Sequence, residues 1–202
     1  MNQRLRSIVR MDNGVLSSRL LEKLNGVNME KSIEQTLPTH SHVHIKFLCL
    51  TLFGCALITL SSLIKIPLYP VSFTLQTFAI YILALTQSPR QAFASVICYP
   101  LIGTIGLPVF CSGANPFWIM GNSGGYLVAF PLAAYCMAKL RQKNSPVIAL
   151  LIGMAIIFIF GFLWLIPLFG LHVAFTKGIL IFIPSELLKI LAAIRLVNWR
   201  KR

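Results

Sequence analysis

The stretch NSPVIALLIGMAIIFIFGFLWLIPLFGLHVAFT, residues 144–176, contains no Asp, Glu, Lys or Arg over 33 residues. A helix needs roughly 20 apolar residues to cross the hydrocarbon core of a membrane. Three more uncharged runs precede this one, at 47–64, 66–89 and 91–138. The residue alternation of a transmembrane β-barrel is absent. The runs therefore predict an all-α integral membrane protein.

The composition of the whole chain agrees with this prediction. Hydrophobic residues make up 56% of the chain and charged residues only 11%, and the mean hydropathy is +0.78. A soluble domain has about a quarter of its residues charged. A net charge of +13 suggests a nucleic-acid partner in a soluble protein. Here the basic residues lie at the ends of apolar segments, which is a pattern of membrane topology, so no nucleic-acid partner is expected.

The chain divides after residue 45. Residues 1–45 form a basic polar leader without the apolar core of a secretory signal. Three interpretations of the leader stay open: a helix on the membrane surface, a disordered cytoplasmic tail, or a true start further along at Met11 or Met29. Residues 46–202 form the predicted membrane domain.

Proline, glycine and basic turns divide this domain into six predicted transmembrane helices. An even number of spans places both termini on one side of the membrane. On that assumption, 15 of the 18 Lys and Arg residues lie on the side of the termini, which predicts that both are cytoplasmic in a bacterial-type plasma membrane. The helices are expected at about 46–66, 74–87, 91–106, 126–140, 147–168 and from about 172, with an interruption near Pro184.

Three irregular segments fall on the opposite, outer side: 67–73, 107–125 and the region of Pro184. All are rich in Pro, Gly or small polar residues. Non-helical backbone at membrane depth is tolerated where it is buried in protein or lines a cavity. The pattern therefore predicts a pocket with a lid in the outer half of the bundle.

Glu186 is the one acidic residue after position 34, and it lies in an apolar segment. A charged residue at the membrane centre costs roughly 2.5–3.5 kcal/mol on insertion scales. Lys189 is three residues further on, so the two side chains share one helix face. Two explanations stay open: an ion pair that only braces the bundle, or a polar pocket floor in which Glu186 accepts N–H groups and Lys189 pairs with an anionic ligand.

The sequence lacks the catalytic, nucleotide-binding and metal-binding motifs that would indicate an enzyme. The string GNSGG, 121–125, resembles a serine-protease motif but lacks its aspartate. A Walker A motif, G-x-x-x-x-G-K-[ST], is absent. The histidines of HSHVH, 40–44, have no acidic or cysteine partner nearby and are interpreted as a polar linker. The five cysteines show no C-x-x-C spacing and are interpreted as small apolar residues. We expect no catalysis, no cofactor and no metal.

Four strings, in order along the chain, resemble motifs of the BioY family, the biotin-specific substrate-binding (S) components of energy-coupling-factor (ECF) transporters. They are IPLYPVSFTLQT (66–77), GTIGLPVF (103–110), GNSGGYLVAFPLAAY (121–135) and GILIFIPSELLK (178–189). The resemblance covers nearly the whole membrane part and none of the leader. It implies a six-helix S component that binds biotin from outside. The implied partners are biotin, membrane lipid, a transmembrane coupling protein and two cytoplasmic ATPases.

The resemblance also implies roles for single residues. Lys189 matches the family's lysine and would pair with the carboxylate of biotin, and Glu186 falls on the family's aspartate and would accept a ureido N–H. Asn115 and Asn122 are candidates for further polar contacts from the 107–125 loop. Gln76 and Tyr126 fall on motif positions, where a structural role is the alternative.

Two positions depart from the family pattern: Ser185-Glu186 stands where the family has Gly-Asp, and Asn122-Ser123 where it has Pro-Thr. Both lie near the expected site. An S component for a different small anionic vitamin is therefore the first alternative, and a structural membrane protein braced by Glu186 and Lys189 is the second.

The first helix carries one further expectation. S components often present small residues in an A-x-x-x-A pattern to the coupling protein, and the aligned positions here are Cys55 and Thr59. Spacing of this kind is also common in ordinary helix packing.

Overall fold

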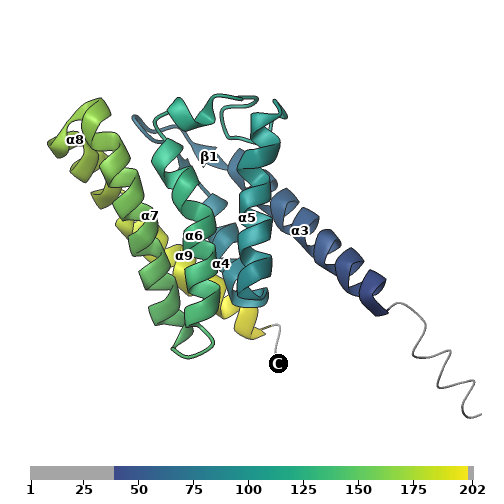
Figure 1. The fold of residues 1–202 in the computed structure, drawn as a ribbon. Coiled ribbons are helices and arrows are strands. Elements are labelled where there is room, and N and C mark those ends of the chain that lie inside the picture. Colours follow the sequence, from purple (N-terminus) through teal and green to yellow (C-terminus); the bar gives the residue numbers. More distant parts are fainter. Residues whose placement is uncertain (1–38, 200–202) are drawn as a thin grey trace, which may run out of the picture. The chain divides into compact units, whose positions relative to one another are not determined.

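The computed structural model describes the backbone of residues 39–199 and the side chains of residues 44–199. Over this range the chain forms six helices of 11 residues or more, one at each predicted place (Figure 1). Most of the leader lies outside the described residues, and its described part, 39–45, belongs to the first helix. The six helices are α3 (Thr39–Leu63), α4 (Gln76–Thr86), α5 (Pro89–Thr104), α6 (Gly124–Leu140), α7 (Pro146–Phe169) and α9 (Ile183–Trp199).

Proline and glycine set several helix boundaries. Pro89 and Pro146 lie in the first turn of α5 and α7, where a backbone N–H is not needed. Ser88 caps α5 by accepting a 3.4 Å hydrogen bond from the backbone N–H of Gln91. Gly170 follows α7 with a φ of 78°, a left-handed conformation that a side chain disfavours. The observed ends of α4 to α7 differ from the predicted ends by at most two residues.

The first helix begins earlier than predicted. The segment 40–44, which was interpreted as a linker, is helical and belongs to α3, which begins at Thr39. The sequence holds no proline between Pro38 and Pro67 that would interrupt this helix. Among the side chains of residues 44–199, no three of His, Cys, Asp or Glu are grouped closely enough to hold a metal ion. The side chains of His40 and His42 lie outside this range.

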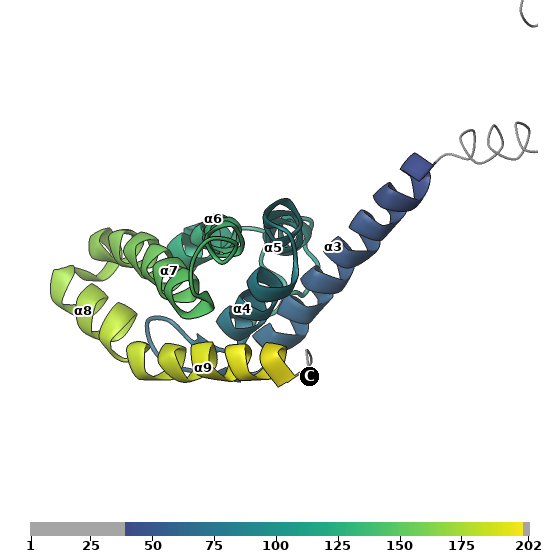
Figure 2. The ribbon, with the colours of Figure 1, turned by 90° about the horizontal axis from the view of Figure 1, so that it is seen from below.

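Within residues 46–199, α4 is the central helix. Figure 2 shows it between α5, α6 and α9, and it contacts all three. Its side chains Ile80, Tyr81 and Leu83 are each at most 2% exposed. Most of the α4 residues are apolar, as expected of a helix that is surrounded by other helices. A polar side chain on α4 is consequently held in the interior of the bundle.

Two short strands, which the sequence analysis did not predict, follow α3. Strand β1 (Lys65–Ile66) pairs antiparallel with β2 (Phe73–Thr74), and Lys65 lies opposite Thr74. The predicted Pro-rich loop is the tip of this hairpin and contains a cis peptide bond between Tyr69 and Pro70. Strands of two residues are too short to show the alternation by which a strand is recognised in sequence.

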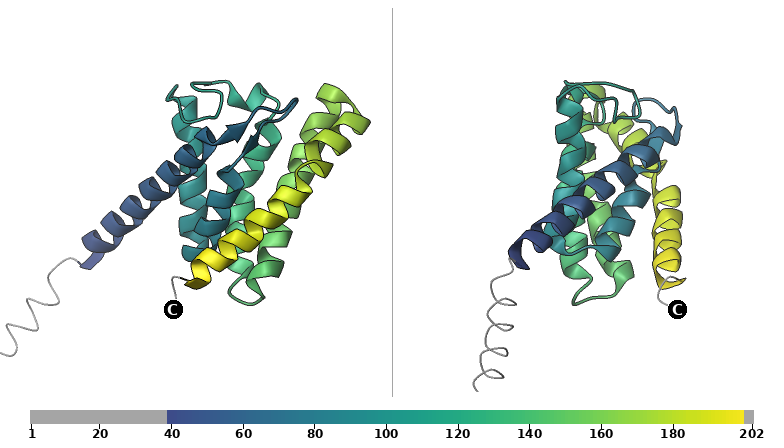
Figure 3. Two further views of the ribbon diagram at one scale, coloured as in Figure 1. Left: turned by 180° about the vertical axis from the view of Figure 1, so that it is seen from behind. Right: turned by 90° about the vertical axis from the view of Figure 1, so that its right-hand side faces the viewer.

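A second irregular segment, 105–123, lies at the same end of the bundle as the hairpin (Figure 3). It contains one 3₁₀ turn, η1 (Trp118–Met120). The hydroxyl of Ser62, near the end of α3, donates a 2.7 Å hydrogen bond to the backbone oxygen of Val109. The segment is thereby joined to the end of α3 from which the hairpin begins.

The last helix is interrupted, as predicted. A short helix α8 (Leu171–Phe175) continues into a π-helical turn, η2 (Thr176–Leu180), and α9 begins at Ile183. Single π-helical turns are frequent at functional sites. The interruption places Glu186 in the first turn of α9, where a negative charge is favoured by the helix dipole.

Two of the described helices, His44–Leu63 within α3 and Pro146–Phe169, are long and apolar enough to cross a membrane. Helices α4, α5, α6 and α9 have 11, 16, 17 and 17 residues, fewer than the roughly 20 that a perpendicular span requires. Large apolar side chains are exposed on the outer faces, for example Leu163 at 60% and Leu188 at 68%. The number of membrane crossings stays a prediction.

Candidate substrate pocket

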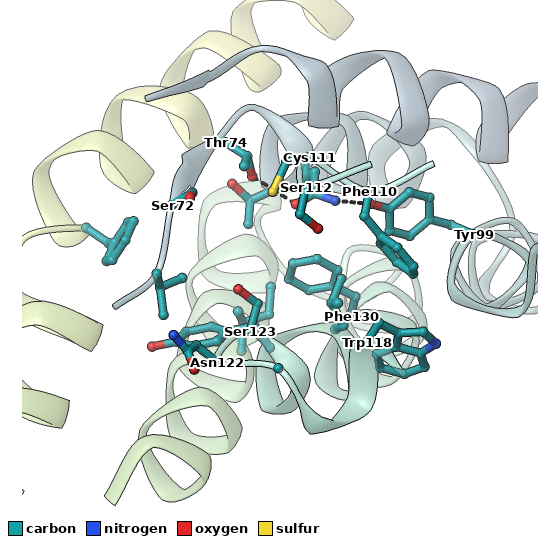
Figure 4. A pocket seen from close by; sticks show the side chains of 18 of the residues that line it. Ser72, Thr74, Tyr99, Phe110, Cys111, Ser112, Trp118, Asn122, Ser123 and Phe130 are labelled. Carbon is teal, nitrogen blue, oxygen red and sulfur yellow. Dashed lines mark hydrogen bonds between the residues drawn. The ribbon is translucent and has the colours of Figure 1, made fainter. Parts of the chain in front are cut away.

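A cavity of about 380 Å³ lies beneath the two irregular segments and is lined by residues of α4, α5, α6, α7 and α9. Pockets for small molecules usually have volumes between roughly 300 and 1,000 Å³. Figure 4 shows Thr74, Cys111 and Ser112 on one side of the cavity and Asn122 and Ser123 on the other. All six predicted substrate-binding residues line it: Gln76, Asn115, Asn122, Tyr126, Glu186 and Lys189.

The charged part of the lining, which we call the floor, consists of Glu186 and Lys189. Their side chains are joined by a 2.7 Å ion pair and are 5% and 8% exposed. Burial of a charge is expensive unless it is paired and hydrogen-bonded. The ion pair and the further contacts of both groups meet this requirement.

The carboxylate of Glu186 accepts hydrogen bonds from two residues of α4. The hydroxyl of Thr77 donates to Oε1 over 2.8 Å, and the hydroxyl of Tyr81 donates to Oε2 over 2.6 Å. Oε1 also accepts a hydrogen bond from the ammonium of Lys189. Among the described side chains, Tyr81 is the one donor to Oε2. Because a carboxylate oxygen can accept two hydrogen bonds, Oε2 has room for one more donor.

The ammonium of Lys189 has three protein acceptors. Besides Glu186, these are the backbone oxygen of Thr74 at 2.7 Å and the hydroxyl of Thr77 at 3.0 Å. The nitrogen also lies 4.2 Å from the ring centroid of Phe73, within the range of a cation–π contact. An ammonium has three protons. Pairing of Lys189 with a ligand anion would therefore displace one of these acceptors.

Gln76 stands at the beginning of α4 and belongs to a second polar group. Its side-chain N–H donates to the hydroxyl of Tyr99, and its Oε1 accepts a 2.9 Å hydrogen bond from Thr74. Tyr99 on α5 is fully buried. Gln76 thus connects α4, α5 and the hairpin at the edge of the cavity. Among the described residues, one of its two amide protons has an acceptor, and the other is available.

Tyr126, in the first turn of α6, is fixed by close packing. Its hydroxyl donates a 2.7 Å hydrogen bond to the backbone oxygen of Gly178 in the π-helical turn. A Cβ added to Gly161 on α7 would lie 2.2 Å from the Tyr126 ring. Only glycine therefore lets α7 approach this ring. Tyr126 joins α6, α7 and the interrupted last helix around the cavity.

The two asparagines belong to the segment above the cavity. Asn122 donates a 3.0 Å hydrogen bond to the backbone oxygen of Pro70, which connects the segment to the hairpin tip. The backbone oxygen of Asn115 accepts a 3.2 Å hydrogen bond from the backbone N–H of Trp118. The Trp118 ring packs against Phe110 with a centroid separation of 6.1 Å, and both line the cavity. This segment thus supplies two aromatic side chains to the cavity lining.

The sequence analysis missed Thr77, Tyr81 and Tyr99. Thr77 closes the string IPLYPVSFTLQT, and Tyr81 lies four residues further on, so both occupy one face of α4. A polar stripe on an otherwise apolar helix was a signal that could have identified this pair. Tyr99 had no such signal, because its partner Gln76 is 23 residues away.

The expected partner-binding pair, Cys55 and Thr59, lies on the less exposed side of α3. Cys55 is 4% exposed, and Thr59 is half-buried and donates a 3.0 Å hydrogen bond to the backbone oxygen of Cys55. The exposed face of α3 at this level carries Leu52, Ala56 and Leu60 instead. In this structure Cys55 is a packing residue of the bundle.

Comparisons with known proteins agree with this architecture. The chain is 40% identical over 146 residues to "Probable biotin transporter BioY" of Rickettsia prowazekii (strain Madrid E), covering 68% of this chain and 74% of that protein. It is 32% identical over 140 residues to the protein of the same name from Pyrococcus horikoshii, covering 69% of this chain and 86% of the relative.

A crystal structure of the S-component for biotin from an ECF-type ABC transporter superposes with a TM-score of 0.70 and 26% sequence identity. The match covers 80% of this chain and 94% of that one. The model of the BioY family matches residues 31–202. Over that range, which includes every helix described above, the chain belongs to the BioY family.

Proposed function

We propose that this protein is the substrate-binding subunit of a biotin uptake transporter. The observation that carries the proposal is the buried Glu186–Lys189 floor beneath a cavity of ligand size, in a chain of this family. The relatives named above are transporters, which agrees with the prediction that the chain is not an enzyme.

The chemistry of biotin fits the lining. Its ureido ring has N–H donors, and Oε2 of Glu186 has room for one donor. Its thioether ring is apolar, and the cavity is lined by Phe110, Trp118 and Phe158 among other apolar residues. Gln76, Asn115, Asn122 and Tyr126 complete the proposed contact set. Each of them lines the cavity and has a side-chain amide or hydroxyl.

The family implies a membrane protein, and we further propose six crossings with both termini in the cytoplasm. The distribution of Lys and Arg supports this orientation, because 15 of the 18 lie on the predicted inner side. The cavity, the hairpin and the 105–123 segment then face outward in a bacterial-type plasma membrane. The short helices would then cross the membrane together with the irregular segments that adjoin them.

Transport across the membrane needs a source of energy that this chain does not supply. The sequence contains no Walker A motif. We therefore propose that a transmembrane coupling protein and two cytoplasmic ATPases complete the transporter, with membrane lipid around the exposed apolar faces. Leu52, Ala56 and Leu60 on α3 are one surface that a coupling protein can reach.

The test is calorimetric titration of the purified, detergent-solubilised protein with biotin, desthiobiotin and an unrelated anionic vitamin. Saturable binding of biotin, with weaker binding of the unrelated vitamin, is expected. Preference for the other vitamin would mean that Ser185-Glu186 and Asn122-Ser123 have changed the ligand. A folded sample that binds none of the three would favour a bracing role for the ion pair and would overturn the proposal.

A further inference from the structure

The cation on the floor is already engaged, which leaves the anionic end of the ligand without a partner there. Lys189 is hydrogen-bonded to Glu186, Thr74 and Thr77, so each ammonium proton has an acceptor. The pair with Glu186 also cancels its charge. A ligand carboxylate beside Lys189 would have to compete with the protein's own carboxylate for the same ammonium.

The rest of the lining offers no second cation. Among the described residues that line the cavity, Glu186 and Lys189 are the charged ones, and the others are apolar or neutral polar. A carboxylate moved from water to an apolar site without a counter-charge is strongly disfavoured. The carboxylate of a bound ligand is therefore expected at the rim of the cavity, where it keeps contact with water and with a cation outside the lining.

Lys65 is a cation outside the lining that adjoins two of the lining segments. It lies directly opposite Thr74 in the hairpin, and side chains of directly opposed residues project from the same face of a strand pair. Thr74 lines the cavity. The ammonium of Lys65 donates to the backbone oxygen of Cys111, which also lines the cavity. Lys65 thus extends from one lining segment to the other.

The ammonium of Lys65 has donors to spare. Within the described part of the chain, its one hydrogen-bond acceptor is the Cys111 oxygen, so two protons are available. The side chain is exposed, in contrast to that of Lys189. A ligand anion can therefore approach Lys65 without displacing any protein carboxylate.

We propose that Lys65 is the counter-cation for the ligand's carboxylate and a specificity-determining residue at the mouth of the pocket. This inference rests on the proposed function and assigns the carboxylate to the rim, whereas the floor receives the uncharged ring. It replaces the expectation that Lys189 performs this task.

The test compares biotin with biotinamide, its uncharged amide, by calorimetric titration of wild type, Lys65→Ala and Lys65→Arg. An exposed ion pair contributes up to roughly 1 kcal/mol, so Lys65→Ala should weaken biotin binding about fivefold. The affinity for biotinamide should stay unchanged. Lys65→Arg should retain most of the preference for biotin, and the difference between the ligands should shrink at high salt.

Lys177→Ala is the matched control, because Lys177 is an exposed lysine outside the lining and belongs to the π-helical turn. It should leave both affinities unchanged. Equal losses for biotin and biotinamide in Lys65→Ala would mean that Lys65 only holds Cys111, and would overturn the inference. So would an unchanged affinity for biotin, or a loss as large in Lys177→Ala. A folded wild-type protein that binds neither ligand would overturn the proposed function itself, and the inference with it.

Discussion

Tyr81 on the central helix donates a 2.6 Å hydrogen bond to Oε2 of Glu186 on α9, across 105 residues of sequence. Tyr81 is fully buried, and Glu186 is 4% exposed. The hydrogen bond fixes the rotation of the carboxylate, while Thr77 and Lys189 hold its other oxygen. The carboxylate on the floor is therefore pre-organised. Its remaining acceptor position on Oε2 points in one direction, which Tyr81 on a different helix fixes.

Tyr81→Phe removes this hydroxyl and keeps the ring. We expect biotin binding to weaken about tenfold, because the hydrogen bond that orients Oε2, of a kind that contributes roughly 1.5–3 kcal/mol to the folded protein, would be lost. Titration calorimetry measures the affinity. Tyr135→Phe is the control, since Tyr135 on α6 is outside the cavity lining. A lower melting temperature with unchanged affinity would mean that the hydroxyl serves folding alone.

Removal of one member of the ion pair should be worse for stability than removal of both. Lys189→Met leaves the buried carboxylate of Glu186 without its cation, which costs roughly 3–5 kcal/mol when a buried pair is broken. Glu186→Gln combined with Lys189→Met leaves no buried charge, so its melting temperature should recover toward that of wild type. Thermal unfolding in detergent measures both variants.

The same double variant separates binding from bracing. We expect it to remain folded and to lose biotin binding, because the amide introduced at position 186 would be a weaker acceptor than the carboxylate, and the ammonium that orders Thr77 would be absent. Unchanged biotin affinity in the stable double variant would show that the pair only braces the bundle. The second alternative from the sequence analysis would then be correct.

Gly161→Ala tests the packing that fixes Tyr126. The new Cβ would lie 2.2 Å from the Tyr126 ring, so α6 and α7 must separate or the ring must turn. Overpacking of this kind costs typically 1–3 kcal/mol, and we expect weaker biotin binding as well. Gly153→Ala is the control: its Cβ meets the flexible side chain of Met137, away from the cavity. Equal effects of both variants on affinity would exclude a specific role of Tyr126.

The sequence predicted the helices well because their boundaries are local. Pro89, Pro146 and Gly170 act within their own turn, and the charge pair at 186 and 189 lies on one turn of helix. The hairpin was missed because each of its strands has only two residues, too few to show the alternation that marks a strand in sequence. The sequence analysis expected the ligand's anion at Lys189 but could not identify the protein acceptors that engage this ammonium. The competing acceptors of Lys189, Thr74 and Thr77, come from more than 110 residues away.

Cys111 offers a test of the pocket that does not depend on mutating the floor. Its side chain is half-buried and lines the cavity beneath the 105–123 segment, whereas Cys49 on α3 is exposed. In a variant that keeps only Cys111, bound biotin should slow the reaction with a small thiol reagent, because the ligand occupies the space that the reagent must enter. In a variant that keeps only Cys49, the rate should be the same with and without biotin. Mass spectrometry of the labelled protein follows both reactions. If biotin binds but Cys111 reacts at an unchanged rate, the ligand occupies a different place, and the assignment of this cavity as the biotin site is wrong.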